Sequence, residues 1–287
     1  MRSSGQGGFT GFGCALGKTK GGRWLLPLLF VLVGSGTWAT PVFAGPPFRT
    51  DDPQPVDFRH WEAYFFSTLD KTRDGRATQF PALEFNWGAI PNVQLHLIIP
   101  VASFRPPGGS TWFGAGDVEV GVKYRFIQEN GHRPQVGIFP QLELPTGSAA
   151  RGLGNGQVWA RLPVWAQKSW GPWTSYGGGG YAVNRAPEMQ SHGFGGWLLQ
   201  RDFGKRLTLG GEIYSEGRNS ITIRSSTIAD FGGYYNFSSH FSLLFSVGRD
   251  FSGGPHTVAY LGLYWTWGGH AEEVPQKFPS HLNRAQS

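Results

Sequence analysis

The chain has 287 residues, with 25 Lys and Arg against 19 Asp and Glu. Four of the basic residues and none of the acidic ones precede residue 45, so the remainder carries 21 − 19 = +2, too little positive charge to indicate a nucleic-acid-binding protein. The single cysteine, Cys14, excludes a disulfide framework and a cysteine-ligated metal site.

Residues 1–44 have the composition of a secretory signal peptide. The four basic residues are followed by the apolar run from Trp24 to Val33 and then by small residues that end at Ala44. This pattern predicts export and cleavage after Ala44. The alternative is a retained N-terminal anchor helix, but the apolar run contains Pro27 and is shorter than the roughly 20 residues that a membrane helix needs.

Residues 45–57, with the sequence GPPFRTDDPQPVD, form a proline-rich stretch before the first regular pattern. We expect an extended lead-in on the periplasmic side of the membrane. At the other end, residues 268–287 are polar and are expected to form a periplasmic tail. Either segment could instead enter the lumen of the fold described below.

Apolar and polar residues alternate along most of the chain from residue 58 onward. The alternation is clearest at residues 116–127, where Val118 and Val120 alternate with Asp117 and Glu119. In a strand, such residues point to opposite faces, whereas the helical period would mix the two sets. Turns rich in glycine, proline and asparagine separate the alternating segments. The pattern predicts twelve strands, at residues 58–69, 78–87, 93–103, 116–127, 134–145, 157–168, 173–183, 193–201, 206–216, 226–235, 241–249 and 257–267.

The predicted strands have the features of a membrane-spanning β-barrel. Each is near the length of about 9–11 residues that a tilted strand needs to cross a bilayer, and short connections alternate with long ones. Aromatic residues make up 15% of the chain while its mean hydropathy is only −0.27, as expected when every second side chain faces water. Trp61, Trp87, Trp265 and Trp267 lie near the short-turn ends, where an aromatic girdle is expected.

We therefore predict an all-β fold, an antiparallel transmembrane β-barrel of about 12 strands at residues 58–267. Its expected location is the outer membrane of a Gram-negative bacterium. The alternative is a secreted sandwich or lipocalin-like barrel, in which the same alternation would surround an ordinary aromatic core.

The polar face of the strands supplies the candidate site. In a water-filled lumen its charges stay solvated and set selectivity, whereas in a narrower lumen they pair across the barrel and block it. Both signs alternate, so strong selectivity for anions or cations is not expected. The residues predicted to line the lumen, and with it a solute pathway, are Glu84, Gln94, His96, Asp117, Glu119, Lys123, Arg125, Gln141, Glu143, Arg161, Gln167, Glu212, Glu216 and Asp230.

Two stretches resemble a known family. They are residues 45–67, GPPFRTDDPQPVDFRHWEAYFFS, and residues 152–184, GLGNGQVWARLPVWAQKSWGPWTSYGGGGYAVN, in which FRTDDP and LPVWAQKSWGPW are the more specific parts. The family consists of bacterial outer-membrane proteins labelled by similarity to the outer-membrane component of the MetA pathway of phenol degradation. The resemblance implies a channel or uptake role for small, hydrophobic or aromatic solutes, and it carries over no catalytic or binding residue. One difference is that the chain runs 20 residues past Trp267, whereas such barrels often end on an aromatic residue that the insertion machinery reads.

Three functions are open at this point. The first is a passive channel or uptake porin for small solutes. The second is a membrane-embedded lipid hydrolase, with His192 and His256 as the residues to test, and the third is a closed structural or adhesive barrel. We expect the channel and no enzyme activity, because the chain has no Gly-x-Ser-x-Gly nucleophile elbow and no metalloprotease or calcium-loop pattern.

The same residues limit the expected cofactors and partners. The eight histidines are scattered, so no cofactor and no metal site is expected. The expected partners are outer-membrane lipid and lipopolysaccharide, the barrel assembly machinery and a small solute of unidentified chemistry. No nucleic acid is expected.

Overall fold

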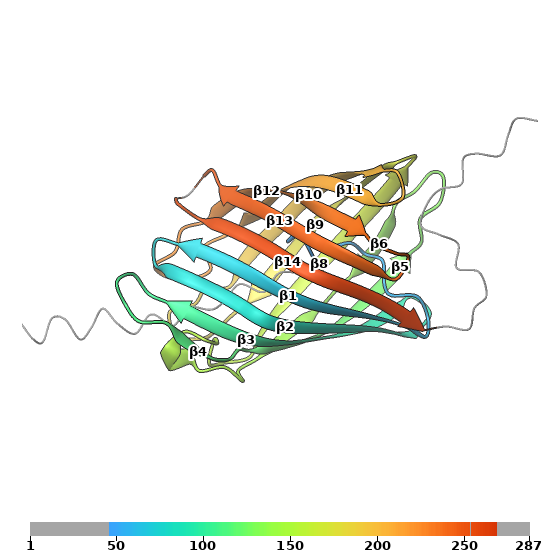
Figure 1. The fold of residues 1–287 in the computed structure, drawn as a ribbon. Coiled ribbons are helices and arrows are strands. Elements are labelled where there is room, and N and C mark those ends of the chain that lie inside the picture. Colours follow the sequence, from blue (N-terminus) through green and yellow to red (C-terminus); the bar gives the residue numbers. More distant parts are fainter. Residues whose placement is uncertain (1–45, 253, 269–287) are drawn as a thin grey trace, which may run out of the picture. The chain divides into compact units, whose positions relative to one another are not determined.

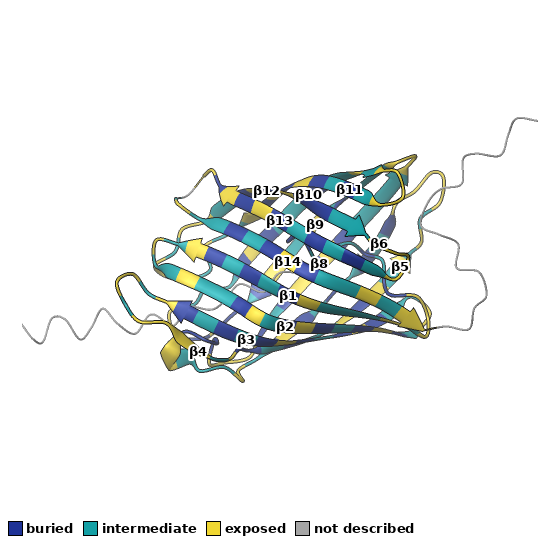
Figure 2. Ribbon diagram, in the orientation of Figure 1, coloured by how far each residue is buried: buried dark blue, intermediate teal, exposed yellow. Residues whose placement is uncertain are grey.

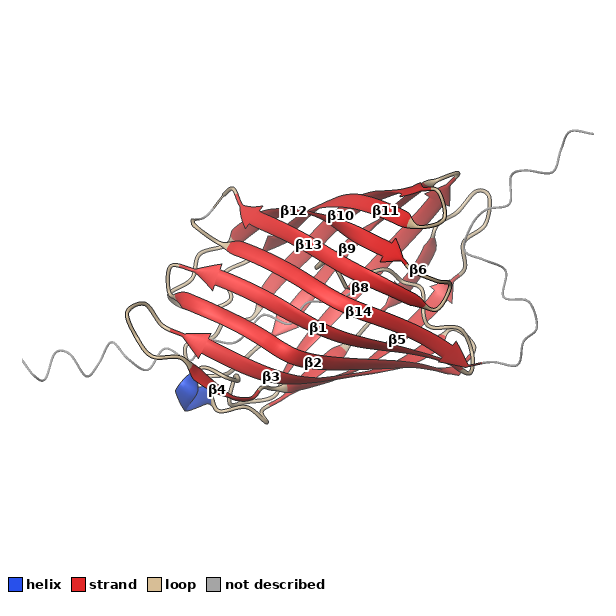
Figure 3. Ribbon diagram, viewed as in Figure 1, coloured by secondary structure: helices blue, strands red, loops and turns tan. Residues whose placement is uncertain are grey.

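The computed structural model describes residues 46–252 and 254–268. The predicted signal peptide and polar tail lie outside the described residues, apart from Gly268. Regular structure in the described part is almost entirely strand, with one turn of 3-10 helix, η1 (Ala149–Arg151) (Figure 3). Within these described ranges, no helix is long and apolar enough to cross a membrane.

Fourteen strands form one antiparallel sheet (Figure 1). They are β1 (His60–Thr72), β2 (Gly75–Ile90), β3 (Val93–Arg105), β4 (Trp112–Ala115), β5 (Val118–Ile127), β6 (Gln135–Ile138), β7 (Gln141–Leu144), β8 (Trp159–Trp170), β9 (Trp173–Val183), β10 (His192–Phe203), β11 (Leu207–Glu216), β12 (Ser226–Asn236), β13 (Phe241–Asp250) and β14 (Thr257–Gly268).

Two strands of the wall are each interrupted once. Strands β4 and β5 both pair with β3, and strands β6 and β7 both pair with β8. The fourteen segments therefore make twelve wall strands, which confirms the predicted number. The predicted strand 134–145 is split into β6 and β7, and β4 lies before the predicted strand 116–127, in a stretch predicted to be a loop. Pro140 lies at the second interruption, where it has no N–H to donate to a ladder.

The sheet closes between its first and last strands. Strand β1 pairs with β14 from His60 opposite Gly268 to Lys71 opposite Thr257. A sheet that pairs its first strand with its last is a barrel. This closure excludes the two-sheet sandwich, which the alternation of residues alone could not exclude. The predicted antiparallel β-barrel is confirmed.

Side chains alternate between two environments along each strand (Figure 2). In β3, Gln94 and His96 are buried inside the barrel, whereas Leu95 and Ile99 on the outer face are 41% and 46% exposed. An apolar outer face and a polar interior are the arrangement that a barrel needs in a lipid bilayer.

Tryptophans at the short-turn end stack on one another. The ring centroid of Trp61 lies 5.4 Å from that of Trp87 and 6.3 Å from that of Trp267, because the three residues are directly paired on β1, β2 and β14. Trp265 stacks on Phe241 with a centroid distance of 5.0 Å. These half-exposed rings form the kind of aromatic belt that lies at a membrane interface.

The chain before β1 runs inside the wall. Phe48 and Thr50 are completely buried and Asp51 is 2% exposed, all within the barrel. The sequence predicted a periplasmic lead-in at residues 45–57 and left entry into the lumen open, and the structure shows entry. Such a position depends on tertiary contacts that a proline-rich stretch without periodicity does not reveal. We refer to residues 46–57 as the lumenal segment.

Candidate functional site

The lumenal segment is anchored by a buried arginine. The Arg49 guanidinium lies 3.1 Å from the Asp70 carboxylate of β1 and 3.7 Å from the Glu216 carboxylate of β11. The backbone N–H of Arg49 donates to Glu212 at 3.0 Å, and the N–H of Thr50 donates to the same carboxylate. Because a buried charge is stable only when it is paired, these carboxylates fix the segment to two separate parts of the wall.

A second ion pair holds the middle of the segment. The Lys123 ammonium of β5 lies 3.0 Å from the Asp51 carboxylate, and farther along the N–H of Val56 donates to the Gln94 side chain at 3.0 Å. Burial raises the pKa of the Asp51 carboxyl, and the charge of Lys123 opposes that effect. The segment is thus held by wall side chains.

Glycines of the wall allow the segment to approach closely. A Cβ at Gly196 of β10 would collide with the Thr50 hydroxyl, and a Cβ at Gly137 of β6 would lie 3.1 Å from the carbonyl oxygen of Pro53. The absence of a side chain at these two positions leaves the space that the segment occupies.

Large side chains from the wall fill the middle of the lumen beside the segment. Trp165 is completely buried and packs in one cluster with Phe139, Phe194 and Tyr214. The Arg161 guanidinium donates to the Tyr214 hydroxyl at 2.6 Å and lies 4.4 Å from the centroid of the Phe194 ring. The central level of the lumen is therefore occupied by side chains.

A buried histidine links three neighbouring strands on the lumenal side. His96 Nδ1 lies 2.7 Å from the Asn86 side-chain oxygen, and His96 Nε2 lies 2.8 Å from the Glu119 carboxylate. The Asn86 amide in turn donates to Glu84 at 2.8 Å. These lumenal polar groups are paired with each other.

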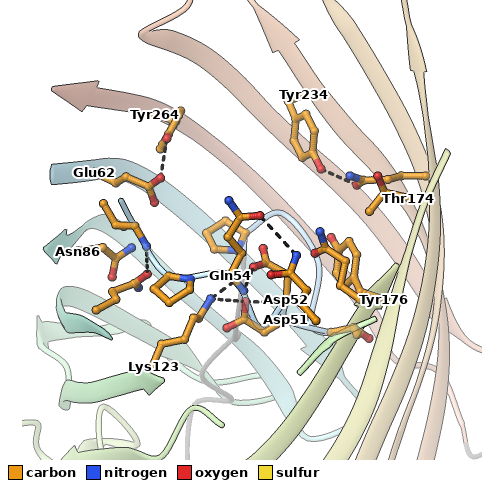
Figure 4. Close-up of a pocket in the computed structure, with 18 of the residues that line it drawn as sticks. Asp51, Asp52, Gln54, Glu62, Asn86, Lys123, Thr174, Tyr176, Tyr234 and Tyr264 are labelled. Atoms are coloured by element: carbon orange, nitrogen blue, oxygen red, sulfur yellow. Dashed lines mark hydrogen bonds and ion pairs between the residues drawn. The ribbon is translucent and has the colours of Figure 1, made fainter. Parts of the chain in front are cut away.

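A cavity remains at each end of the lumen. The larger, of about 560 Å³, lies toward the short turns and includes Glu62 and Tyr234 in its lining (Figure 4). The smaller, of about 270 Å³, lies among the long connections and includes Arg49 and Glu216. None of the described residues lines both cavities, and Arg49 borders one while Thr50 borders the other. We call these cavities the large and small vestibules, and the lumenal segment lies between them.

The predicted lumen residues all lie away from the exposed outer face of the described barrel. Glu84, Gln94, Lys123, Arg125 and Gln167 line the large vestibule, and Glu216 lines the small one. Arg125, Gln167 and Glu216 are half-buried, and the buried members are Glu84, Gln94, His96, Asp117, Glu119, Lys123, Gln141, Glu143, Arg161, Glu212 and Asp230.

Some of the predicted lumen residues do not line either vestibule. Asp117 accepts a hydrogen bond from the N–H of Gly147 at 2.8 Å, so it holds a loop next to the first wall interruption. Glu143 and Asp230 are buried in the lumen but are not in the lining of either vestibule.

Sequence reasoning missed several lining residues. Glu62, Asn86 and Asp202 line the large vestibule, and Asp70 pairs with Arg49. The period-two pattern could have found Asn86, which lies two residues from Glu84 on the same face. No sequence signal identifies Arg49 as an anchor.

The two histidines considered for lipid hydrolysis contact carboxylates inside the barrel. His192 Nε2 lies 2.7 Å from Glu216, and His256 Nε2 lies 2.9 Å from Asp70. Both carboxylates also pair with Arg49, so the histidines belong to its anchor. Among the described residues, no three His, Cys, Asp or Glu side chains are grouped to hold a metal ion.

The model of the family described as "Putative MetA-pathway of phenol degradation" matches residues 67–265, more than half of the chain. No curated protein matches the sequence.

Solved structures share the fold. The COG4313 outer membrane channel from Pseudomonas putida F1 is 13% identical with a TM-score of 0.61, over 75% of this chain and 98% of that one. The KdgM porin in complex with disordered oligogalacturonate is 10% identical with a TM-score of 0.50, over 72% and 99%. The NanC porin is 9% identical with a TM-score of 0.50, over 71% and 98%. These similarities show an outer-membrane β-barrel fold.

Proposed function

Because this chain belongs to the family named for the MetA pathway of phenol degradation, we propose that it is an outer-membrane channel for the uptake of small solutes. In this proposal, the lumenal segment is the displaceable part of the central barrier. Export requires removal of the signal peptide, for which we propose cleavage after Ala44. The lumenal segment would then begin next to the new N-terminus and have one free end.

The proposal rests on the position of the lumenal segment between the two vestibules. The barrel has a vestibule at each end, and a segment that is not a wall strand lies between them. The segment can move without breaking a ladder of the wall, because the contacts that hold it are to wall side chains such as Lys123, Gln94 and Glu212. Displacement of such a segment would let a channel open and close, and an anchoring or adhesive barrel has no need of this arrangement.

The size and lining of the large vestibule favour small, partly apolar solutes. Its volume of about 560 Å³ lies within the range of about 300–1,000 Å³ that is usual for small-molecule sites. Tyr64, Tyr176, Tyr234 and Tyr264 contribute aromatic rings among its polar groups. We propose no catalytic role. Both ring nitrogens of His192 are engaged, Nδ1 with the Gln190 carbonyl oxygen and Nε2 with Glu216. His256 contacts Asp70, which binds Arg49.

Reconstitution of the mature chain, residues 45–287, in planar lipid bilayers tests the proposal. We expect discrete current steps of small amplitude, because the barrier leaves only brief or narrow openings. Folding is checked first on a gel, where the unboiled barrel should migrate faster than the boiled chain, and boiled protein serves as the inactive control. Bilayers that stay silent with folded protein, at every voltage they tolerate, would contradict the channel.

A further inference from the structure

The large vestibule is unevenly charged. Arg125, one of its two basic residues, donates to the side-chain oxygens of Asn92 and Gln135 and not to a carboxylate. The acidic residues that line it are Asp51, Asp52, Glu62, Glu84, Glu129 and Asp202, and the basic residues are Lys123 and Arg125. Glu129 is paired with Lys168 at 3.1 Å, and Glu84 lies 3.6 Å from His96. The other lining carboxylates still outnumber the two basic residues, so the vestibule has a surplus of negative charge, whereas the alternation of signs along the strands predicted no strong selectivity.

Two of these carboxylates form no ion pair with a basic side chain in the described part of the chain. Glu62 accepts hydrogen bonds from the hydroxyls of Tyr64 at 3.0 Å and Tyr264 at 2.8 Å. Asp202 accepts a hydrogen bond from the Thr208 hydroxyl at 2.6 Å. Because neutral donors hold them in place, their negative charge remains available to a cation in the cavity.

Aromatic rings surround the same cavity. The ring centroids of Tyr64 and Tyr264 lie 4.8 Å apart beside Glu62, and Tyr176 and Tyr234 line the other side (Figure 4). The vestibule already contains one cation–π contact, in which the Lys123 ammonium lies 4.9 Å from the centroid of Phe139. Tyrosine rings combined with a carboxylate are a recognised means of binding ammonium groups.

We propose that the large vestibule is a binding site for small organic cations, in which Glu62 pairs with an ammonium or guanidinium group and the tyrosines contact its aromatic or alkyl body. The inference rests on the proposed channel function and names the class of solute. An anion would meet the surplus of carboxylates, and a neutral aromatic molecule would gain only the ring contacts. A cation with an apolar body gains from both features.

Isothermal titration calorimetry on the refolded mature chain in detergent tests this site, and the result does not depend on whether the barrel conducts ions. The probes are benzyltrimethylammonium, the neutral benzyl alcohol and the anionic benzoate. We expect saturable binding of the cation alone, with an affinity that falls as salt is added. Glu62→Gln should raise its Kd by about tenfold or more, as expected for the loss of a close charge partner worth about 1.4 kcal/mol.

Three matched variants separate the contributions of charge and ring. Glu188→Gln removes an exposed acid outside both vestibules and should leave binding unchanged. Tyr264→Phe keeps the ring and should retain most of the affinity, whereas Tyr264→Leu should lose it. Each variant is accepted only if its unboiled form migrates as a folded barrel.

Three results would overturn the site: no saturable binding of the cation, equal binding of benzyl alcohol and the cation, or a Kd unaffected by Glu62→Gln. If the cation does not bind while planar bilayers show current steps, the solute class is wrong and the channel stands. If the cation binds and bilayers stay silent, the channel is wrong and the site stands.

Discussion

Deletion of residues 45–56 from the mature chain is expected to raise the single-channel conductance several-fold and to replace brief openings with a steady open level. The deleted residues include Phe48, Thr50 and Asp51, which are buried between the two vestibules. Their removal would leave water where side chains now block the lumen, and the conductance of a pore rises with its open cross-section. The measurement is single-channel recording of residues 57–287, refolded from denaturant with an initiator methionine.

The deletion should leave the wall intact, because the ladders of β1 to β14 contain no residue of the lumenal segment. Heat-modifiable migration of the deleted chain, compared with the mature chain, is the control for folding. A folded deletion variant with the conductance of the parent would show that the segment is not the barrier, and that the aromatic cluster around Trp165 alone closes the lumen.

Arg49→Met is expected to release the lumenal segment from the wall. The change leaves the Asp70 and Glu216 carboxylates without their arginine, although His256 and His192 still contact them. Breaking a buried ion pair costs about 3–5 kcal/mol when no partner remains, and we expect about 2–3 kcal/mol here because the histidines remain. The undocked population should then increase about 30- to 100-fold, at about 1.4 kcal/mol for each factor of ten.

The position of the segment can be followed through a single thiol. Since Cys14 precedes the proposed cleavage site, the mature chain has no cysteine, and Thr50→Cys introduces one at a completely buried position. Its rate of modification by a membrane-impermeant maleimide should increase about 30- to 100-fold when Arg49→Met is added, in line with the population change. Arg59→Met, at an exposed position outside the segment, is the matched control and should leave the rate unchanged. Equal rates with and without Arg49 would show that the guanidinium does not hold the segment.

The wall could be predicted from the sequence because period-two alternation is a local property. Strand β9 matches the predicted range 173–183, and the predicted number of wall strands is correct. The short strand β4 and the break after it, at Gly116 and Asp117, were not predicted, and at this break Asp117 contacts the loop at Gly147. A long-range contact of this kind has no periodic signature.

Only part of the candidate site could be predicted from the sequence. Alternation placed Glu84 and Lys123 on the inner face, but it could not show that Lys123 pairs with Asp51, which lies 72 residues earlier in the chain. Nor could it distinguish charges that line a vestibule from those that bind the segment, such as Glu212. That distinction depends on the path of a proline-rich stretch, which side-chain contacts determine and periodicity does not.

A disulfide between the lumenal segment and the wall tests the position of the segment inside the barrel. A Cβ built at Gly196 lies 3.2 Å from the Thr50 Cβ, close to the separation of about 3.8 Å found in disulfides. In the mature Thr50→Cys/Gly196→Cys variant, we predict a disulfide under mild oxidation, seen as faster migration of the boiled, non-reduced chain, with conductance low until reductant is added. The pair Thr50→Cys/Gly211→Cys, with its second thiol on an exposed outer position of β11, should not cross-link. Two free thiols in the first pair, both rapidly modified from water, would contradict a lumenal position of the segment and with it the proposed barrier.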